Sequence, residues 1–402
     1  MKKLGWAFGF YFLYYAAFAF LAPFTVLYYQ QLNFTGTQIG LLTGLPSLIT
    51  MVANPFLSSL ADRTQRQHLI LSVGILSAAL GIFALTWLES FIAVFLLVIT
   101  FNFLFSPVAS LGDTATMAML GENRGLYGRV RVGGTFGWGI FALFAGKLLD
   151  LQGVTALFYV FSIISLVNLF VSQKLSFGQP HAEASTSGGV PALLRNRLWI
   201  FFLASAFLGG LGAFTVAAFL SPYLKDLNAT GNQIGIALSA ATLPELFVFL
   251  IGDRLVKRFG SRGLFVIALL LMGVRSILFG LASDVTLAIV IQVLGGAIFP
   301  AMWLSGVAYA DEHAPGHLKS TAQGLFGAMS FGFGSAVGGF VGGLLLDSVG
   351  SRGMYMVFGI IILIGWDSSK AFANYCRMLR TPLPKPKVDT VRTTCFLSDR
   401  YK

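Results

Sequence analysis

The chain has 402 residues, of which 56% are hydrophobic and 11% are charged, whereas soluble domains carry about 25% charged residues. This composition excludes an ordinary soluble domain. It predicts an all-α integral membrane protein, because long apolar runs rather than short alternating segments recur along the sequence. The formal net charge of +11 does not indicate nucleic-acid binding, since no compact basic surface with interleaved aromatic residues remains outside those runs.

We predict twelve spans, divided into two six-helix bundles. The N-terminal bundle covers residues 1–172 and the C-terminal bundle covers residues 198–366. Residues 173–197, which are rich in Ser, Gly, Ala and Pro, are predicted to form a flexible linker. Lys and Arg residues concentrate in this linker and in the loops on its side of the membrane. The positive-inside rule therefore predicts that both termini are cytoplasmic. We expect a multi-pass protein of a bacterial-type plasma (inner) membrane.

Aromatic residues crowd the first span, which runs from about Trp6 to Tyr29. Tyr11, Tyr15 and Phe18 recur at helical spacing and therefore share one face. That face could line a cavity in which sugars or bases stack, although lipid contact is the commoner role for any single ring.

A nine-residue segment that follows the first span is repeated in the second half of the chain. LNFTGTQIG begins at Leu32 and LNATGNQIG begins at Leu227, and the two agree at seven of nine positions across an offset of 195 residues. An offset near half the chain length indicates an internal duplication of six-span units. We interpret both copies as turns that lead into a helix, rather than as glycosylation sites at Asn33 and Asn228.

The short loop after the second span is crowded with charge at Asp62, Arg63 and Arg66, and the duplication offset carries Arg63 onto Arg258 in the second half. Short loops with several charges often serve only to fix topology. Because charge recurs at the matching place, we predict that these four residues form a gate, in which ion pairs dock helices of the two halves.

A carboxylate and an arginine flank a Gly-rich turn after the fourth span. Asp113 lies nine residues before Glu122, and Arg131 lies nine residues after it. If both flanks are helical, each rises about 1.5 Å per residue, so the two charges reach the same depth and can face one another. The alternative is that Arg131 is an ordinary basic residue at the cytoplasmic entrance of a helix.

A second pair shows the same kind of spacing. Glu245 and Arg275 each lie fifteen residues from Gly260, within apolar runs. Charge inside a span is costly and usually has both a partner and a function. We predict that these two side chains pair, and that Glu245 carries a proton when a conformational change separates them. A static buried ion pair is the alternative.

The last apolar run begins at Met354 and ends at Trp366, so its thirteen residues fall short of the roughly 17 needed to cross a bilayer. Residues 367–402 are polar and basic and are predicted to form a disordered tail. We therefore expect a truncated twelfth helix. We hypothesise that the reading frame is truncated or shifted there, which resequencing of the coding region would test.

Two motifs resemble those of the major facilitator superfamily. The loop around Asp62 is similar to its Gly-x-x-x-Asp-Arg-x-Gly-Arg-Arg motif. The segment YGRVRVGGTFGW, from Tyr127 to Trp138, is similar to the fifth span of lactose permease-like sugar/proton symporters, whose branch also holds nucleoside/proton symporters. The resemblance covers residues 1 to about 366 and implies the major facilitator fold.

The resemblance also implies a site. In these symporters, the residues that match Asp113 and Arg131 bind the sugar, and the residue that matches Trp138 stacks on a sugar ring. Glu245 and Arg275 match the glutamate of the eighth span and the arginine of the ninth. The chain departs from the sugar symporters in its tenth span, which lacks their histidine and acid, so the resemblance does not identify the sugar.

We predict a secondary active transporter that moves a small polar organic solute, sugar-like or nucleoside-like, by alternating access, with proton-coupled symport as the favoured mode. The alternatives are an exporter or uncoupled facilitator of metabolites or drugs, and a non-transporting membrane sensor with the same fold. The sequence contains no motif for hydrolysis or metal binding, so we expect neither an enzyme nor a bound metal or cofactor. The expected partners are the solute, protons and the lipid bilayer, and the expected state is a monomer.

Overall fold

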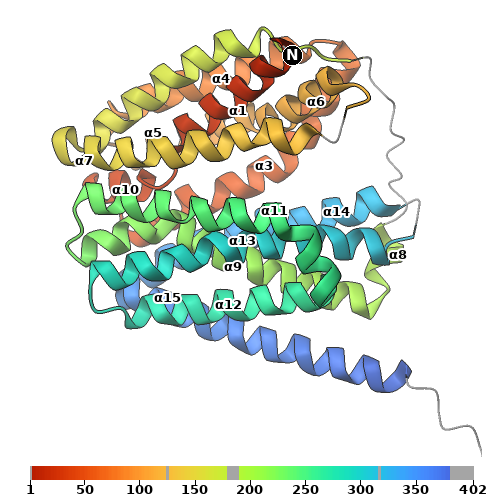
Figure 1. Cartoon of the computed structure of the whole chain (residues 1–402). Helices are drawn as coiled ribbons and strands as arrows, with labels where there is room; N and C mark the ends of the chain where they lie inside the picture. Colours follow the sequence, from red (N-terminus) through yellow and green to blue (C-terminus); the bar gives the residue numbers. More distant parts are fainter. Residues whose placement is uncertain (1, 124–125, 179–189, 316–317, 381–402) are drawn as a thin grey trace, which may run out of the picture.

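The computed structural model describes residues 2–123, 126–178, 190–315 and 318–380, which are almost entirely helical and contain no β-strand. The predicted all-α class is thus confirmed. In chain order (Figure 1) the elements are α1 (Lys2–Leu21), α2 (Thr25–Gln31), α3 (Gly36–Thr64), α4 (Gln67–Leu85), α5 (Phe91–Phe105), α6 (Val108–Leu120), α7 (Tyr127–Ser172), α8 (Val190–Leu194), α9 (Arg197–Asp226), α10 (Gly231–Ala240), α11 (Thr242–Phe259), α12 (Ser261–Leu281), α13 (Val285–His313), α14 (Lys319–Gly327), the π-helix η3 (Ala328–Gly334) and α15 (Ser335–Arg380).

Within the described residues, ten helical stretches are long and apolar enough to cross a membrane. Two of them, Tyr127–Ser172 and Thr321–Asp367, contain 46 and 47 residues, or about 70 Å of helix against a hydrocarbon core of about 30 Å. Each is divided by a glycine with positive φ, Gly153 in α7 and Gly350 in α15. Each of these two divided stretches supplies two spans. The ten stretches together therefore supply the twelve spans predicted from the sequence.

The spans form two bundles, as the internal duplication predicts. Helices α1–α7 make the first bundle, coloured red to yellow in Figure 1, and α9–α15 make the second, coloured yellow-green to blue. In the first bundle, α1 packs along α7, and α4 packs against α5 and α7. In the second, α12 packs against α13 and α15, and α9 packs against α15.

The two bundles meet where α3 packs against α15 and α7 packs against α10. Their ribbons converge at one end of the molecule and spread apart at the other (Figure 1). We call the first the sealed end; it carries the turns at residues 32–36 and 227–231 and hydrogen bonds between the bundles. We call the second the spread end; it carries the start of α1 and the turn between α6 and α7.

The duplicated nine-residue segment forms the same structure in both halves. Thr35 and Thr230 each cap a helix with the side-chain hydroxyl, in a capping box completed by Gln38 and Gln233. The asparagine two residues before each threonine has a left-handed backbone, with φ of 56° and 64°, which asparagine adopts more readily than most residues. The interpretation of both copies as turns leading into a helix is therefore confirmed.

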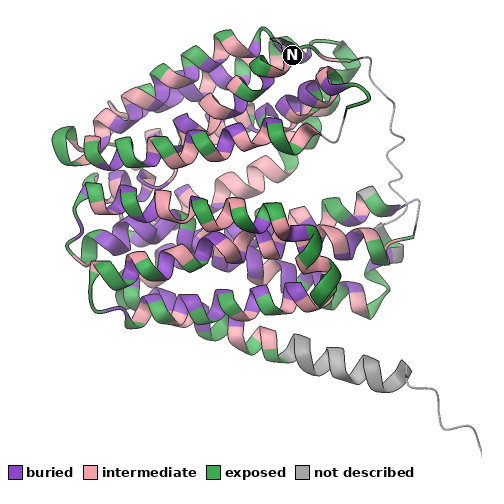
Figure 2. Cartoon of the chain, viewed as in Figure 1, coloured by how far each residue is buried: buried purple, intermediate pink, exposed green. Residues whose placement is uncertain are grey.

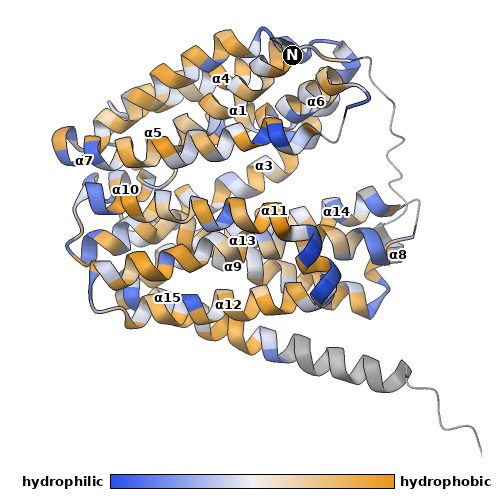
Figure 3. Cartoon of the chain, in the orientation of Figure 1, coloured by the Kyte–Doolittle hydropathy of each residue, from blue (hydrophilic) through white to orange (hydrophobic). Residues whose placement is uncertain are grey.

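Apolar side chains cover the outside of the molecule as well as its interior. Figure 2 shows buried residues on the faces that helices turn toward one another, and Figure 3 shows hydrophobic residues along the outer faces too. Phe170, Leu243 and Leu250 are 73%, 74% and 82% exposed. Apolar surface of this extent is what a helical bundle presents to lipid.

The last helix is longer than its apolar sequence suggested. After the kink at Gly350, α15 continues to Arg380, so the prediction of a disordered tail was wrong for residues 367–380. The rest of that predicted tail, residues 381–402, lies outside the described residues. An apolar run measures how much of a helix fits the bilayer. It does not fix where the helix ends, because the Ala, Lys, Met and Arg residues that follow are good helix formers.

Replacement of Gly153 or Gly350 by alanine should destabilise the protein. Both have positive φ, 79° and 71°, with ψ close to 180°, a region that other residues adopt at a cost of about 1–3 kcal/mol. We expect both variants to melt at a lower temperature than the wild type in detergent. Gly324→Ala is the control, since a Cβ there meets no atom within 4 Å. If all three variants had the same melting temperature, the kinks at Gly153 and Gly350 would not require glycine.

Candidate functional site

The structure brings together the charged pair predicted on either side of the Gly-rich turn. Asp113 lies on α6 and Arg131 near the start of α7, and Arg131 Nη1 lies 3.0 Å from Asp113 Oδ1. The two side chains are 40% and 41% exposed, although they lie in the membrane-length helical stretches Phe91–Leu120 and Tyr127–Ser172. The pair is therefore formed, and both of its side chains remain partly exposed.

Three tyrosines from α1 and α7 surround this pair. The Tyr11 hydroxyl donates to Asp113 Oδ1 at 2.5 Å, and the Tyr127 hydroxyl donates to the same oxygen at 2.8 Å. Arg131 Nη2 donates to the Tyr15 hydroxyl at 3.1 Å. The guanidinium also lies over two tyrosine rings, 5.4 Å from the centroid of Tyr11 and 5.9 Å from that of Tyr15, at cation–π distance.

These hydrogen bonds leave part of each charged group unused. Asp113 Oδ1 accepts from two tyrosines and from Arg131, whereas no described residue donates to Asp113 Oδ2. Likewise, Arg131 uses both terminal nitrogens, and its Nε has no acceptor among the described residues. A carboxylate oxygen can accept and the Nε–H can donate, so the site has one acceptor and one donor available to a solute.

Helical periodicity explains why these side chains meet. Tyr11 and Tyr15 are four residues apart on α1, and Tyr127 and Arg131 are four residues apart on α7, so each pair shares a helix face. The sequence placed the tyrosines of α1 on one face but gave no reason to assign hydrogen bonds to their hydroxyls. Tyr127 was missed as a site residue, although its spacing from Arg131 was the signal that could have identified it.

Glycines on α7 let α1 lie close enough for those tyrosines to reach the pair. A Cβ on Gly137 would lie 2.1 Å from the carbonyl oxygen of Phe12, and one on Gly134 would lie 2.4 Å from Cδ2 of Tyr15. Contacts this short are not possible, so a larger residue at 137 must push the backbone of α1 away from α7, and one at 134 must displace the Tyr15 ring. The glycines in the VGGTFGW segment thus have a specific packing role.

Trp138 lies seven residues after Arg131, about two helical turns, and so shares its face of α7. Its ring is partly buried and packs against the main hydrophobic cluster. The structure therefore places the predicted stacking ring on the same face of α7 as Arg131, about two turns further along the helix.

The second predicted pair is not formed. Arg275 is 5% exposed, donates a hydrogen bond to Gln292 Oε1 and lies over the ring of Phe279, 5.2 Å from its centroid. Glu245, in the first turn of α11, is partly buried and has no ion pair or side-chain hydrogen bond with any described residue. Equal counts from Gly260 give equal depth but not equal rotation about the helix axis, and Arg275 points toward α13.

The predicted gate also lacks its ion pairs in this structure. Asp62, Arg63, Arg66 and Arg258 are exposed at the spread end, and none of them forms a salt bridge with a described residue. Asp62 instead accepts a 3.4 Å hydrogen bond from the neighbouring Gln67. The reason is geometric, because the two bundles are apart at this end.

Comparisons with known proteins show the family to which the chain belongs. A model of the MFS_1 like family matches residues 6–357. The maltose permease of Geobacillus stearothermophilus is 28% identical over 362 residues, covering 89% of this chain and 91% of the permease. The nucleoside permease NupG of Escherichia coli (strain K12) is 23% identical over 376 residues, covering 86% and 88%.

A solved structure has the same fold. The crystal structure of nucleoside transporter NupG superposes with a TM-score of 0.82 over 93% of this chain and 100% of that chain, at 18% sequence identity. At this identity the likeness concerns the fold. The maltose permease and the nucleoside permease each match this chain over nearly the full length of both bundles, so the match is not limited to one half.

The contact between α1 and α7 can be tested at single glycines. Gly137→Ala should push α1 away, loosen the bonds of Tyr11 and Tyr15, and lower the free energy of unfolding by about 1–3 kcal/mol, as overpacked sites do. Gly128→Ala, on the same helix, is the matched control because a Cβ there meets no atom within 4 Å. Melting temperatures in detergent check this, and equal values for the two variants would contradict it.

Proposed function

Because the chain belongs to the MFS_1 like family, whose fold it has, we propose that this solute transporter carries a small polar organic solute with neighbouring hydroxyl groups, such as a sugar or a nucleoside. Movement would occur by alternating access, in which the two bundles rock about a site between them. The names of two relatives, a maltose permease and a nucleoside permease, support this class of solute.

The observation that carries the proposal is the unused half of the Asp113–Arg131 pair. One solute hydroxyl would donate to Asp113 Oδ2, and its neighbour would accept from Arg131 Nε, a combination that suits adjacent hydroxyls. The pair is charge-balanced, so it favours a neutral solute over an anion. Trp138 would cover an apolar face of the sugar ring or base.

The distribution of basic residues supports an orientation for this transporter. The positive-inside rule assigns the more basic side to the cytoplasm. The spread end carries more basic residues than the sealed end, with Arg63, Arg66, Arg254, Lys257 and Arg258 at the former against Lys147, Lys225 and Arg352 at the latter. We therefore place the spread end in the cytoplasm, which makes this conformation inward-facing. The four predicted gate residues would pair when that end closes.

Proton coupling is the mode of transport that we favour, with Glu245 as the carrier. A partly buried carboxylate without a described partner is costly inside a membrane span unless it binds a proton or a cation. Its predicted partner, Arg275, is committed to Gln292. Coupling would therefore depend on when Glu245 exchanges its proton with either side, and not on an exchange of partners with Arg275.

Solute binding tests the role of the pair. A thermal-shift screen of the purified protein against sugars and nucleosides identifies a ligand, and its affinity is then measured for Asp113→Asn and Arg131→Lys. We expect each variant to bind at least tenfold more weakly, which corresponds to about 1.4 kcal/mol. Asp311→Asn is the matched control, since it removes the similarly exposed Lys319–Asp311 pair. Near-normal affinity in both site variants would remove the pair from the binding site.

Uptake into proteoliposomes tests proton coupling. An inward proton gradient should accelerate net uptake of the ligand by the wild type, and Glu245→Gln should abolish that acceleration while keeping counterflow of the ligand. Glu122→Gln, at an exposed carboxylate in the turn after α6, should behave as the wild type does. If Glu245→Gln keeps the acceleration, Glu245 is not the carrier; if the wild type shows none, transport is uncoupled.

A further inference from the structure

We propose that Asp150 and Asp347 form a duplicated clasp that holds the sealed end shut. Each carboxylate belongs to one bundle and binds the first turn of a helix in the other bundle. The clasp would set how readily the sealed end opens, and this role rests on the alternating access proposed above.

The hydrogen bonds of the two halves of the clasp correspond. Asp347, on α15, accepts a bond from the backbone N–H of Gly36 at 2.6 Å, and Gly36 is the first residue of α3. Asp150, on α7, accepts bonds from the backbone N–H groups of Gly231 at 2.5 Å and Asn232 at 2.8 Å, the first two residues of α10. Both contacts therefore join the bundles at the start of a helix.

Local structure leaves those N–H groups available. The first N–H groups of any helix have no partner within the helix. In α3 and α10 the capping boxes use the hydroxyls of Thr35 and Thr230 for the third helical N–H, so the first and second remain unbonded. A carboxylate from the other bundle accepts from the first N–H in α3 and from both in α10, and its charge also suits the positive end of the helix dipole.

Paired glycines bring the backbones together one helical turn away from each aspartate. A Cβ on Gly36 would lie 2.1 Å from the carbonyl oxygen of Gly343, and a Cβ on Gly231 would lie 2.4 Å from that of Gly146. Gly343 and Gly146 precede Asp347 and Asp150 by four residues, so each glycine and its aspartate share a helix face. Backbone contact and carboxylate bond thus form one unit.

The unit is a product of the internal duplication. GKLLDLQG at residues 146–153 and GLLLDSVG at residues 343–350 agree at five of eight positions, including the contact glycine, the aspartate and the glycine of the kink. Their partners, Gly36 and Gly231, lie in the duplicated nine-residue segment. The two contacts therefore hold the bundles together in a nearly symmetric way, α15 on α3 and α7 on α10.

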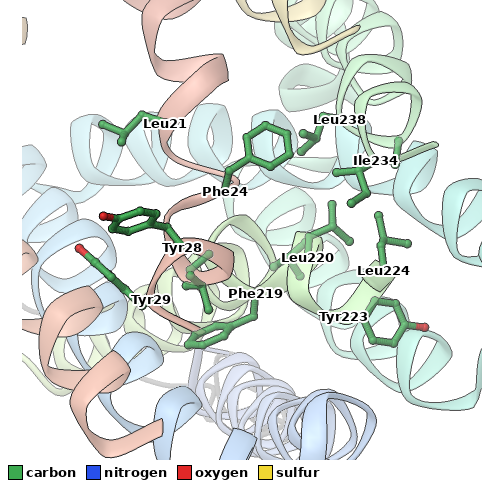
Figure 4. Close-up of a cluster of buried hydrophobic side chains, with 14 of the residues drawn as sticks. Leu21, Phe24, Tyr28, Tyr29, Phe219, Leu220, Tyr223, Leu224, Ile234 and Leu238 are labelled. Atoms are coloured by element: carbon green, nitrogen blue, oxygen red, sulfur yellow. The ribbon is translucent and has the colours of Figure 1, made fainter. Parts of the chain in front are cut away.

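An apolar plug lies beside the clasp. Figure 4 shows Phe24 beside Leu238 and Ile234 of α10, with Leu220 and Leu224 of α9 nearby. Phe24, Leu224 and Ile234 are fully buried, and Leu220 is 1% exposed. Apolar contact is non-directional, so the plug can exclude water but cannot fix the register of the bundles. The directional carboxylate bonds supply that register.

Cysteine labelling tests the clasp without any solute. Leu220→Cys is placed in the full chain with Cys376 and Cys395 changed to Ser, and its reaction with a charged maleimide is timed in detergent. We expect Asp150→Asn together with Asp347→Asn to speed labelling at least tenfold, because asparagine lacks the charge and offers a single acceptor oxygen. Each single variant should give a smaller increase in labelling rate. If the double variant fails to fold, the two single variants still test the clasp.

Asp284→Asn is the matched control, since Asp284 bonds the N–H of Leu287 at the start of α13 within its own bundle. It should leave labelling unchanged. Unchanged labelling in the folded clasp variants, or an equal increase with Asp284→Asn, would overturn the clasp. Because no solute is present, failure of the solute proposal would leave this result unaffected.

Discussion

Direct backbone contact at glycine holds α1 against α7 and holds the two bundles together. In a membrane, apolar burial does not favour helix association, since lipid is as apolar as the helices, so close packing and polar contacts must do so. Gly137 allows the first contact, and the pairs Gly36–Gly343 and Gly146–Gly231 allow the second. At each contact the short distance brings polar groups within hydrogen-bonding range: tyrosines around Asp113 in one case, carboxylates at helix ends in the other.

The first leg of α7 connects these two regions. It carries Arg131 toward the spread end and Asp150 at the sealed end, nineteen residues or about 29 Å apart along one helix. A rigid leg of this length cannot tilt at one end without moving the other. Opening of the sealed end would thus shift Arg131 relative to the second bundle, which is the kind of linkage that alternating access needs.

How much the sequence could predict depended on whether the relevant geometry was local. The pairing of Asp113 and Arg131 was predictable because the two residues flank a short turn. Near such a turn, the number of residues from the turn sets how deep each residue lies. The long arginine side chain can still reach its partner when the two residues do not face each other directly. The same counting failed for Glu245 and Arg275, whose rotation is set by packing of α12 on α13. The clasps join residues 81 and 311 positions apart, and their aspartates lie in segments that read only as apolar span ends. The end of α15 was misjudged because apolar length and helix length are different quantities.

Solute recognition, as we propose it, depends on a solute hydroxyl that donates to Asp113 Oδ2. A double-mutant cycle on protein and ligand tests it most directly: the affinity of a bound sugar or nucleoside is compared with that of its analogue lacking one of the neighbouring hydroxyls, for both the wild type and Asp113→Asn. We expect that removing the hydroxyl weakens binding at least tenfold in the wild type and much less in the variant, because the two changes remove the same hydrogen bond. Equal losses in both proteins would show that the hydroxyl binds elsewhere and would contradict its hydrogen bond to Asp113.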